Sequence, residues 1–499
     1  MMKDLPTVRY ATLPPDPSGT VGVLSRIGYT LEESLSDLID NSIDAGAHRV
    51  VVRFVRTKED LARLIVADNG GGISESHLQK VMQYGVRLKH QKSDLGKYGI
   101  GLKSASFSHC SSLTVVSNDG RAVSGRRWTR ESIGHDWRLE VVDGSAARSF
   151  WETFPRGPLG KSRAGTLVIW DDLELKLGDD AELDGALDHA IKELVVGLGL
   201  RFHRFLEQGR LAIFLDTQTL ARRELGVSVE VHPLNPFSYP RSGRRGFPIE
   251  FTVELGALGK LKMRAHIWPP KSKDPNYKLG GGKVASRQGL YFYRNNRLVQ
   301  AGGWNGYKAD GEPHSSLARV EIDLNPELDS AFRLTVQKNA FQPPHSFAEA
   351  VRSSYAGETS FQSYLDAAED TYRGSEDERV TTHVPGDGIP KESAKKVAKL
   401  LSAHDGGSAG TRKVRFEWVK LPERLVFEVD RDRAVLLLNQ RYRSVIAGDR
   451  SSKADAPLFK VLLFFLSRDV FSRERLSGSR KEELEVLNAS LRAIIGDNI

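Results

Sequence analysis

The chain has 499 residues and a net charge of +8, from 72 lysine and arginine against 64 aspartate and glutamate residues. This length exceeds what one hydrophobic core usually organises, so we expect two or three domains. The single cysteine, Cys110, excludes a disulfide scaffold and a cysteine-ligated zinc site within the chain. The opening residues, MMKDLPTVRY, lack the apolar segment of a signal peptide, which favours a cytoplasmic protein without membrane attachment.

The first strong pattern is TLEESLSDLIDNSIDAG, from Thr30 to Gly46, and it predicts one helix. Thr30 and Glu33 form a capping box, and Gly46 stands where a helix is expected to end. At about 100° per residue, the apolar residues share one side and the polar residues share the other. The polar sector contains Glu33, Asp37, Asp40, Asn41 and Asp44.

This polar sector has two interpretations. A cluster of acidic residues is commonly a solvated helix face, and that interpretation stays open. The alternative is a metal and water site. Asn41 offers an amide oxygen, a hard ligand suited to Mg²⁺ carried in by phosphates, and Asp37 one turn earlier could orient and deprotonate an attacking water.

A second motif follows in LARLIVADNGGGI, where an apolar segment runs into Asp68 and three glycines. The segment predicts a buried strand, and such an ending is often only a turn. Consecutive glycines, Gly70 to Gly72, also let a flat ring approach the backbone closely. A carboxylate at the strand end can accept a hydrogen bond from an exocyclic amine such as that of adenine.

The third motif, SDLGKYGIGLKSASFS, places Gly96, Gly99 and Gly101 before a predicted helix. Glycines before a helix expose backbone N–H groups that can hold phosphates, and Lys103 adds a positive charge. The motif is neither a Walker loop nor a Rossmann fingerprint. The order and spacing of the three motifs together indicate an ATP site.

With these motifs the sequence resembles the GHKL (Bergerat-fold) ATPases, and within them most closely the MORC group. The matching segments are DLIDNSIDAGA at 37–47, DNGGGI at 68–73, QYG at 83–85, GKYGIGLKSAS at 96–106 and AGTLVIWDDL at 164–173. The resemblance covers the first part of the chain and implies ATP and Mg²⁺ as cofactors. The CW-type zinc finger and the coiled coils found in many MORC relatives are not visible, so the chain resembles a compact prokaryotic member.

The resemblance also implies roles for individual residues. Asp68 would bind the adenine amino group, Thr166 would hold adenine through water, and Asn41 would carry Mg²⁺. The other nucleotide-binding residues that it nominates are Gly70, Gly72, Gly96, Gly99, Gly101, Leu102 and Lys103. Residues 82–104 would form the ATP lid.

One position departs from the family pattern. Most relatives carry a glutamate as general base, whereas this chain has Asp37, whose side chain is one methylene shorter. Asp37 occupies the motif position and is our expected base. Glu33, one turn earlier on the same face, is a candidate substitute.

Two downstream segments resemble the GHKL transducer domain. GLYFYRNNRLVQAGG, residues 289–303, predicts a hairpin with an Arg-Asn-Asn-Arg turn, which in the family lies near the nucleotide pocket. RLTVQKNAF, residues 333–341, resembles the loop that sends a lysine to the γ-phosphate and so nominates Lys338. A lysine in a loop is otherwise a solvated charge.

The expected fold is α+β: a Bergerat-fold α/β sandwich ATPase domain at 1–225, a transducer at 226–372, and a small C-terminal α+β module at 413–499. The last element of the transducer would be a helix over about 346–372. Composition predicts linker and loop for 373–412. In the C-terminal module, two strands and two helices are expected, and LFKVLLFFL is too short to cross a bilayer and indicates core or a dimer face.

The expected function is an ATP-gated homodimer that clamps or remodels DNA without base readout. Basic clusters are candidate phosphate contacts, at Arg126, Arg127, Arg130, Arg241, Arg244, Arg245, Lys271 and Lys273. Family context suggests defence against foreign DNA. A protein-remodelling chaperone and a nucleotide-gated scaffold with negligible hydrolysis remain alternatives. A histidine kinase and a nicking repair protein are disfavoured, because no phospho-acceptor histidine helix or C-terminal metal cluster is visible.

Overall fold

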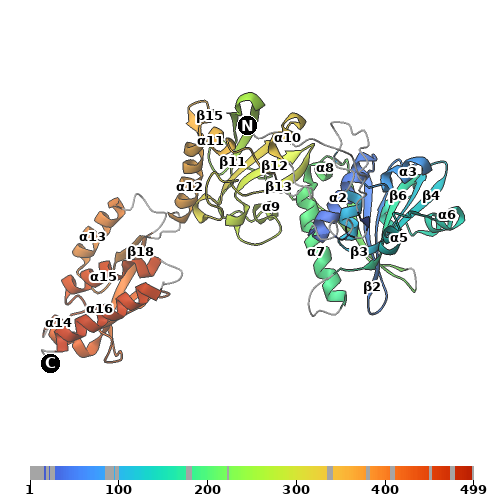
Figure 1. The fold of residues 1–499 in the computed structure, drawn as a ribbon. Coiled ribbons are helices and arrows are strands. Elements are labelled where there is room, and N and C mark those ends of the chain that lie inside the picture. The colour runs from blue at the N-terminus through green and yellow to red at the C-terminus, as the bar shows by residue number, and fades with distance from the viewer. Residues whose placement is uncertain are drawn as a thin grey trace, which may run out of the picture. The chain divides into compact units, whose positions relative to one another are not determined.

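The computed structural model describes residues 16–17, 19, 22, 28–84, 95, 101–175, 183–221, 224–333, 341–377, 382–404, 411–448, 452–472 and 478–496. The chain forms two compact units, residues 1–371 and residues 372–499. Figure 1 labels the elements along the chain. Helices and strands contribute to both units, which confirms the α+β class expected from the sequence.

Residues 49–230 form a mixed sheet with strand order β5-β4-β3-β6-β2-β1-β7-β8, and β9 also pairs with β7. β1 and β7 run parallel, whereas β2 lies antiparallel between β1 and β6. The strands are β1 (Arg49–Arg56), β2 (Leu61–Asp68), β3 (Cys110–Asp119), β4 (Val123–Thr129), β5 (Glu140–Val141), β6 (Ala164–Leu173), β7 (Ala212–Thr219), β8 (Glu224–Leu225) and β9 (Val229–Glu230). The helices around them are α2 (Leu31–Asp44), α3 (Glu75–Met82), α4 (Gly101–Phe107), α5 (Arg130–Gly134), α6 (Gly144–Thr153), η1 (Gly157–Leu159), α7 (Leu183–Arg201) and α8 (His203–Glu207).

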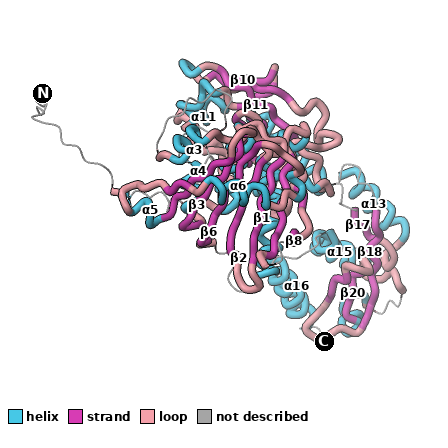
Figure 2. The backbone as a smooth tube through the Cα atoms, turned by 90° about the vertical axis from the view of Figure 1, so that its right-hand side faces the viewer, coloured by secondary structure: helices cyan, strands magenta, loops and turns pink. Residues whose placement is uncertain are grey.

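Helices cover both faces of this sheet, as Figures 1 and 2 show. On one face, Leu38 of α2 and Leu194 of α7 pack with Val52 of β1 in the larger apolar core. On the other face, Trp151 of α6 packs with Val51 in a second core. Neighbouring residues of one strand thus serve opposite cores, because side chains alternate across a sheet.

Helix α2 forms as the sequence predicts. The Thr30 hydroxyl accepts from the Glu33 N–H and the Glu33 carboxylate accepts from the Thr30 N–H, which confirms the capping box. Gly46 follows the helix end with φ +73°, a conformation that favours glycine. The polar sector is not a solvated face, however, because Asp37 and Asp40 are buried.

A second sheet has strand order β13-β12-β14-β11-β10-β15-β16. Its strands are β10 (Ile249–Glu254), β11 (Lys260–Ile267), β12 (Gly289–Arg294), β13 (Arg297–Ala301), β14 (Ala318–Asp323), β15 (Tyr355–Ala356) and β16 (Thr359–Ser360). The expected hairpin at 289–303 is confirmed as β12 and β13. Asn295 and Asn296 form its turn with φ +49° and +67°, as a two-residue hairpin turn requires.

The helices of this region differ from the expectation. The single helix predicted over about 346–372 is wrong, because a short β15–β16 hairpin divides it, with Gly357 at φ +61° in the turn. The helix-like spacing of apolar residues continues across that turn, so the sequence pattern did not indicate a break in the helix. The helical segments are η2 (Gly256–Leu258), α9 (Pro275–Lys278), η3 (Val284–Arg287), η4 (Pro313–Ser315), η5 (Pro326–Leu328), α10 (Asp329–Phe332), α11 (Phe347–Arg352) and α12 (Phe361–Asp377).

The second unit contains a sheet with strand order β17-β18-β20-β19. Its elements are β17 (Thr382–Pro385), α13 (Lys391–His404), β18 (Thr411–Val419), β19 (Phe427–Asp430), β20 (Val435–Asn439), η6 (Gln440–Tyr442), α14 (Arg443–Ala447), α15 (Pro457–Ser472) and α16 (Gly478–Gly496). The linker expected at 373–412 is therefore wrong for 382–404. β17 pairs in parallel with β18, and Val384 and Leu401 enter the core of the unit.

The two helices expected near the C-terminus are confirmed as α15 and α16. Leu463 and Phe464 of α15 are buried in the core, while Leu462 and Phe465 are 53% and 48% exposed. The apolar segment therefore contributes to the core and also presents apolar side chains at the surface. Within the described part of the chain, we find no helix with the length and apolar character needed to span a bilayer.

Candidate functional site

The carboxylate of Asp37 lies buried between Tyr29 and the start of α4. The Tyr29 hydroxyl donates to Asp37 Oδ2 at 3.3 Å. Burial and the Asp37 charge raise the pKa of Tyr29, so the hydroxyl stays protonated and donates. A Cβ on Gly101 would lie 3.1 Å from Asp37 Oδ2, so the glycine leaves space beside the carboxylate.

Asn41 lies one turn after Asp37 on α2 and is exposed. Its amide oxygen is therefore accessible to a ligand. Within the described residues, no three His, Cys, Asp or Glu side chains gather as metal ligands. A Mg²⁺ held by Asn41 would take its other oxygens from phosphates and water, which is how this ion commonly binds beside a nucleotide. The donor set fits that requirement.

Glu33, the candidate substitute base, is engaged at the helix start. Its Oε2 accepts from the Thr30 N–H at 3.0 Å. Releasing the carboxylate for proton transfer would remove one half of the capping box. The Glu33 carboxylate is therefore engaged in holding the start of α2.

The carboxylate of Asp68, at the end of β2, is surrounded by hydrogen-bond donors. The Gly70 N–H donates to Oδ1 at 2.9 Å and the Ser42 hydroxyl to Oδ2 at 3.3 Å. Burial raises the pKa of Asp68 to about 6, against the opposing effect of these donors and the Thr166 N–H. A buried carboxylate with donors on one side is suited to fix the amino group of a base on the other.

Thr166 lies across from the end of β2, on strand β6. Its hydroxyl is 3.0 Å from the Ser117 hydroxyl, which donates to the Gly165 carbonyl and accepts from the Ile73 N–H. Ser117 joins the glycine loop to β6 and was missed from sequence, because nothing in its own motif marks it. The geometry brings Asp68, Thr166 and Ser117 into one polar cluster.

The glycines after Asp68 meet the protein's own backbone. A Cβ on Gly70 would lie 2.8 Å from the Ala45 carbonyl oxygen, and one on Gly72 would lie 1.9 Å from that of Asn118. The close approach predicted for a ligand ring is thus made, in the described residues, by loop packing against α2 and β3. These glycines allow the loop after β2 to pack closely on α2 and β3.

Replacing Gly72 by alanine is therefore expected to destabilise the protein by more than about 3 kcal/mol, through overlap and a φ of +70°. Gly71 is the matched control, since its nearest atom would be 3.7 Å away, and its alanine variant should change stability by less than about 1 kcal/mol. Chemical denaturation compares the two. Equal stabilities would refute this packing argument.

The expected phosphate-binding segment is only partly described. Gly96 and Gly99 lie outside the described residues, while Gly101 and Leu102 begin α4. Lys103 does not meet the expectation of a phosphate contact. It is 2% exposed, its Nζ donates to the carbonyls of Val81 and Gln83 at 2.7 and 3.0 Å, and burial lowers its pKa to about 8.

Lys103 therefore anchors the end of α3, where the expected lid begins. Lys338, the expected γ-phosphate contact, lies outside the described residues. The nearby hairpin turn does reach the site: Arg297 forms an ion pair with Asp40 of α2, Nε to Oδ1, at 2.8 Å. Sequence reasoning did not pair these two residues.

Four of the basic residues expected at phosphates are paired within the fold, among them Arg244, whose Nη1 lies 3.5 Å from Asp370 Oδ2. Arg126 is buried and contacts Glu75, Arg130 contacts Glu174, and Arg127 donates to the Thr114 hydroxyl. The expectation of DNA contact is therefore not supported for this cluster. Basic residues in the loops of the second sheet remain exposed, at Arg241, Arg245, Lys271 and Lys273.

Comparison with known proteins identifies the type of the first domain. Residues 29–153 match the family model described as Histidine kinase-, DNA gyrase B-, and HSP90-like ATPase. From Arabidopsis thaliana, Protein MICRORCHIDIA 1 is 30% identical over 105 residues, which are 20% of this chain and 16% of that protein. Protein MICRORCHIDIA 5 is 33% identical over 107 residues, which are 20% of this chain and 15% of that protein.

The chain thus spans about a sixth of the length of these curated relatives. A solved structure titled "Crystal Structure of N terminal domain of a DNA repair protein" is 15% identical, with a TM-score of 0.41, and the match covers 72% of this chain and 98% of that one. The matched segment of the family model includes Asp37, Asn41 and Asp68. Residues 29–153 therefore form a histidine kinase-, DNA gyrase B- and HSP90-like (GHKL) ATPase domain, which is distantly similar to the MORC proteins.

Proposed function

We propose that the protein is a Mg²⁺-dependent ATPase whose ATP-gated homodimer clamps or remodels DNA. The observation that carries the ATPase proposal is the arrangement of Asp37, Asn41 and the buried Asp68 around α2 and β2, inside the matched segment. It combines a base candidate, an accessible amide oxygen and an acceptor for an amino group. The ATP lid and the dimer are carried over from the family resemblance.

In the proposed mechanism, Asp68 accepts the adenine amino group and Thr166, with Ser117, holds a water at the ring. Asn41 would hold Mg²⁺, which when bound would neutralise phosphate charge. Asp37 orients the attacking water and takes its proton, with its own position set by the Tyr29 hydroxyl. The shorter side chain of Asp37 is consistent with slow turnover. Gly96, Gly99, Gly101 and Leu102 are the proposed phosphate contacts.

We assign the ATPase domain to about 1–225 and a transducer to about 226–372. The separate first and second sheets support this division. Lys338 and the lid would contact ATP only in the closed state, and such differential contacts are what allow a ligand to shift a conformational equilibrium. Hydrolysis would then reopen the dimer.

DNA is the proposed target, bound through its phosphates. The exposed residues Arg241, Arg245, Lys271 and Lys273 occupy loops beside the second sheet. The Gly243 N–H donates to the carbonyl of Ile267, the last residue of β11, and so holds the first of these loops at the strand end from which the second loop starts. Phosphate contacts of this kind carry no base information. We place the protein in the cytoplasm, with defence against foreign DNA as its context.

The test measures ATP turnover with and without long duplex DNA, at about 50 and about 200 mM salt. We expect stimulation by DNA that weakens at the higher salt, because phosphate contacts release counterions. The double variant Arg241→Ala/Arg245→Ala should reduce the stimulation. Lys260→Ala/Lys262→Ala is the control, since Glu254 and Glu250 pair with those lysines.

The outcomes separate the candidate functions. An ATP turnover that does not change when DNA is added would favour a protein-remodelling chaperone. Tight nucleotide binding without turnover would favour a nucleotide-gated scaffold, for which the aspartate at position 37 is the specific support.

A further inference from the structure

The turn between β12 and β13 carries two arginines, and each one forms an ion pair with a different helix. Arg297 pairs with Asp40 of α2, Nε to Oδ1, at 2.8 Å. Arg294 pairs with Asp329 of α10 through Nε, at 2.9 and 3.1 Å. One two-residue turn therefore connects the helix of the proposed ATPase site with a helix of the second sheet's region.

The Arg297–Asp40 pair is almost completely removed from solvent. The side chain of Asp40 is 0% exposed and that of Arg297 is 2% exposed. The Arg297 guanidinium also lies 5.7 Å from the centre of the Phe202 ring. Burying two charges is costly, so such a pair contributes little net stability, but it requires a defined relative position of the two charges.

The position of Asp40 on α2 links this ion pair to the residues proposed for ATP hydrolysis. Asp40 follows Asp37 by three residues, which is about one helical turn, and directly precedes Asn41. A shift of Arg297 would displace the turn of α2 that carries the proposed base and the proposed metal ligand. A displacement of about 1 Å at a reacting group can reduce a rate about 100-fold.

The other arginine connects to the start of α10. Asp329 is the first residue of α10 (Asp329–Phe332), and the chain then runs toward Lys338, which lies outside the described residues. Because β12 and β13 share one tight turn, Arg294 and Arg297 are held at a short separation. The turn is thus a rigid connection between α2 and α10.

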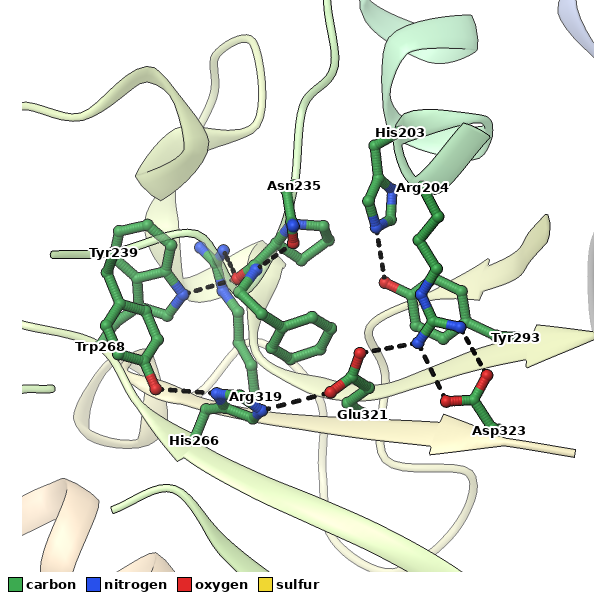
Figure 3. A network of polar contacts seen from close by, with 12 residues as sticks. His203, Arg204, Asn235, Tyr239, His266, Trp268, Tyr293, Arg319, Glu321 and Asp323 are labelled. Carbon is green, nitrogen blue, oxygen red and sulfur yellow. Dashed lines mark hydrogen bonds and ion pairs between the residues drawn. The ribbon is translucent and has the colours of Figure 1, made fainter. Parts of the chain in front are cut away.

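A second network joins α8 to the second sheet beside this turn. Arg204 of α8 contacts Glu321 at 2.7 Å and also Asp323, and it lies 3.5 Å from the centre of the Tyr293 ring. The His203 ring is 3.2 Å from the Tyr293 hydroxyl. Figure 3 shows Arg204 reaching from α8 to these carboxylates of β14. Arg204 also donates to Asn296 Oδ1 in the same turn at 3.4 Å, so this network supports the turn from α8, beside Arg297.

We propose that Arg297 is a positioning residue for ATP hydrolysis, and that the Arg294–Arg297 turn transmits the position of α10 to Asp37 and Asn41 through Asp40. The inference rests on the proposed ATPase function and adds to it the residues that couple the two sheets. Asp40 and Arg297 need not touch ATP for this role.

The test compares Asp40→Asn/Arg297→Gln with a matched control pair. The control is Arg53→Gln/Asp216→Asn, because Arg53 of β1 and Asp216 of β7 form a fully buried ion pair, 2.7 Å from Nε to Oδ1, on the face of the first sheet opposite α2. For each protein, kcat, KM for ATP and Tm are measured. We expect kcat of the Asp40/Arg297 variant to fall about 10- to 100-fold with KM little changed.

The control pair should lower Tm while the folded protein keeps its kcat. If kcat falls in proportion to Tm in both variants, or is retained in the Asp40/Arg297 variant, the positioning role is refuted. Arg297→Lys keeps the positive charge, so its kcat should lie between that of the wild type and that of the Asp40/Arg297 variant. It is the variant to measure if the double variant does not fold.

A further readout separates this inference from the proposed function. Hydrogen exchange of residues 289–303 is followed with and without a non-hydrolysable ATP analogue. If the wild type has no turnover, the ATPase proposal fails. The coupling still stands if the analogue protects the hairpin in the wild type and not in the Asp40/Arg297 variant, and it fails if protection is the same in both.

Discussion

The Asp37→Asn variant is expected to lose ATP turnover by about 10²- to 10⁴-fold, while its affinity for ATP changes only a few-fold. Asparagine keeps the shape of the side chain and cannot accept a proton from water. The Tyr29 hydroxyl can still donate to the amide oxygen, so the local packing is preserved. Single-turnover hydrolysis and equilibrium binding of a fluorescent ATP analogue measure the two quantities separately.

Two further variants decide which carboxylate is the base. Asp37→Glu restores the longer side chain of most relatives and should retain or increase turnover. Glu33→Gln should leave turnover within a few-fold, because Glu33 is engaged in the capping box. Loss of turnover in Glu33→Gln with retention in Asp37→Asn would transfer the role of base to Glu33.

The Asp68→Asn variant is expected to lose ATP affinity by about 100-fold, since a buried hydrogen bond to a charged group contributes up to about 3 kcal/mol. The difference in affinity between ATP and inosine triphosphate should also become smaller. Inosine carries an oxygen in place of the adenine amino group, and the asparagine amide can donate to that oxygen. Isothermal titration with both nucleotides measures this. The Thr166→Val variant removes a hydroxyl that is proposed to act through water, so its ATP affinity should fall by about tenfold or less.

A pH series tests the environment of Asp68 in the free protein. Its pKa of about 6 lies above the usual aspartate pKa of about 3.9, so the folded protein retains a proton that the unfolded chain loses in this pH range. The contribution of Asp68 to stability is therefore present below about pH 4 and lost as pH rises to about 6, by on the order of 3 kcal/mol. The unfolding free energy of wild type relative to Asp68→Asn should fall across this window. A flat difference would contradict the burial argument.

Local patterns of sequence predicted the elements that carry the site. The capping box of Thr30 and Glu33 marks α2 because its bonds lie within one helical turn. The two asparagines predicted the β12–β13 hairpin because both adopt positive φ there. In each case the determining contacts lie between residues close in sequence.

Other expectations failed on contacts between residues far apart in sequence, unlike the helix expected over 346–372, which a local turn divides. The alternative of a solvated helix face does not hold for Asp40, because Arg297 from the other sheet pairs with it. Lys103 fits a phosphate site until the carbonyls of Val81 and Gln83 surround its amine. Burial of a charged group depends on which distant segment reaches it, and spacing along the chain does not contain that information.

The pairing of β17 with β18 determines where the second unit can be separated from the rest. A fragment that begins after α13 would lack β17, so one edge of β18 would lose its parallel partner. It would also lack Val384 and Leu401, and the part of the apolar core that these two side chains fill would be exposed. Open edges of this kind pair with other chains and promote aggregation. A soluble fragment for partner searches should therefore start before Thr382, and the residues with the composition of a linker are part of the cooperative folding unit.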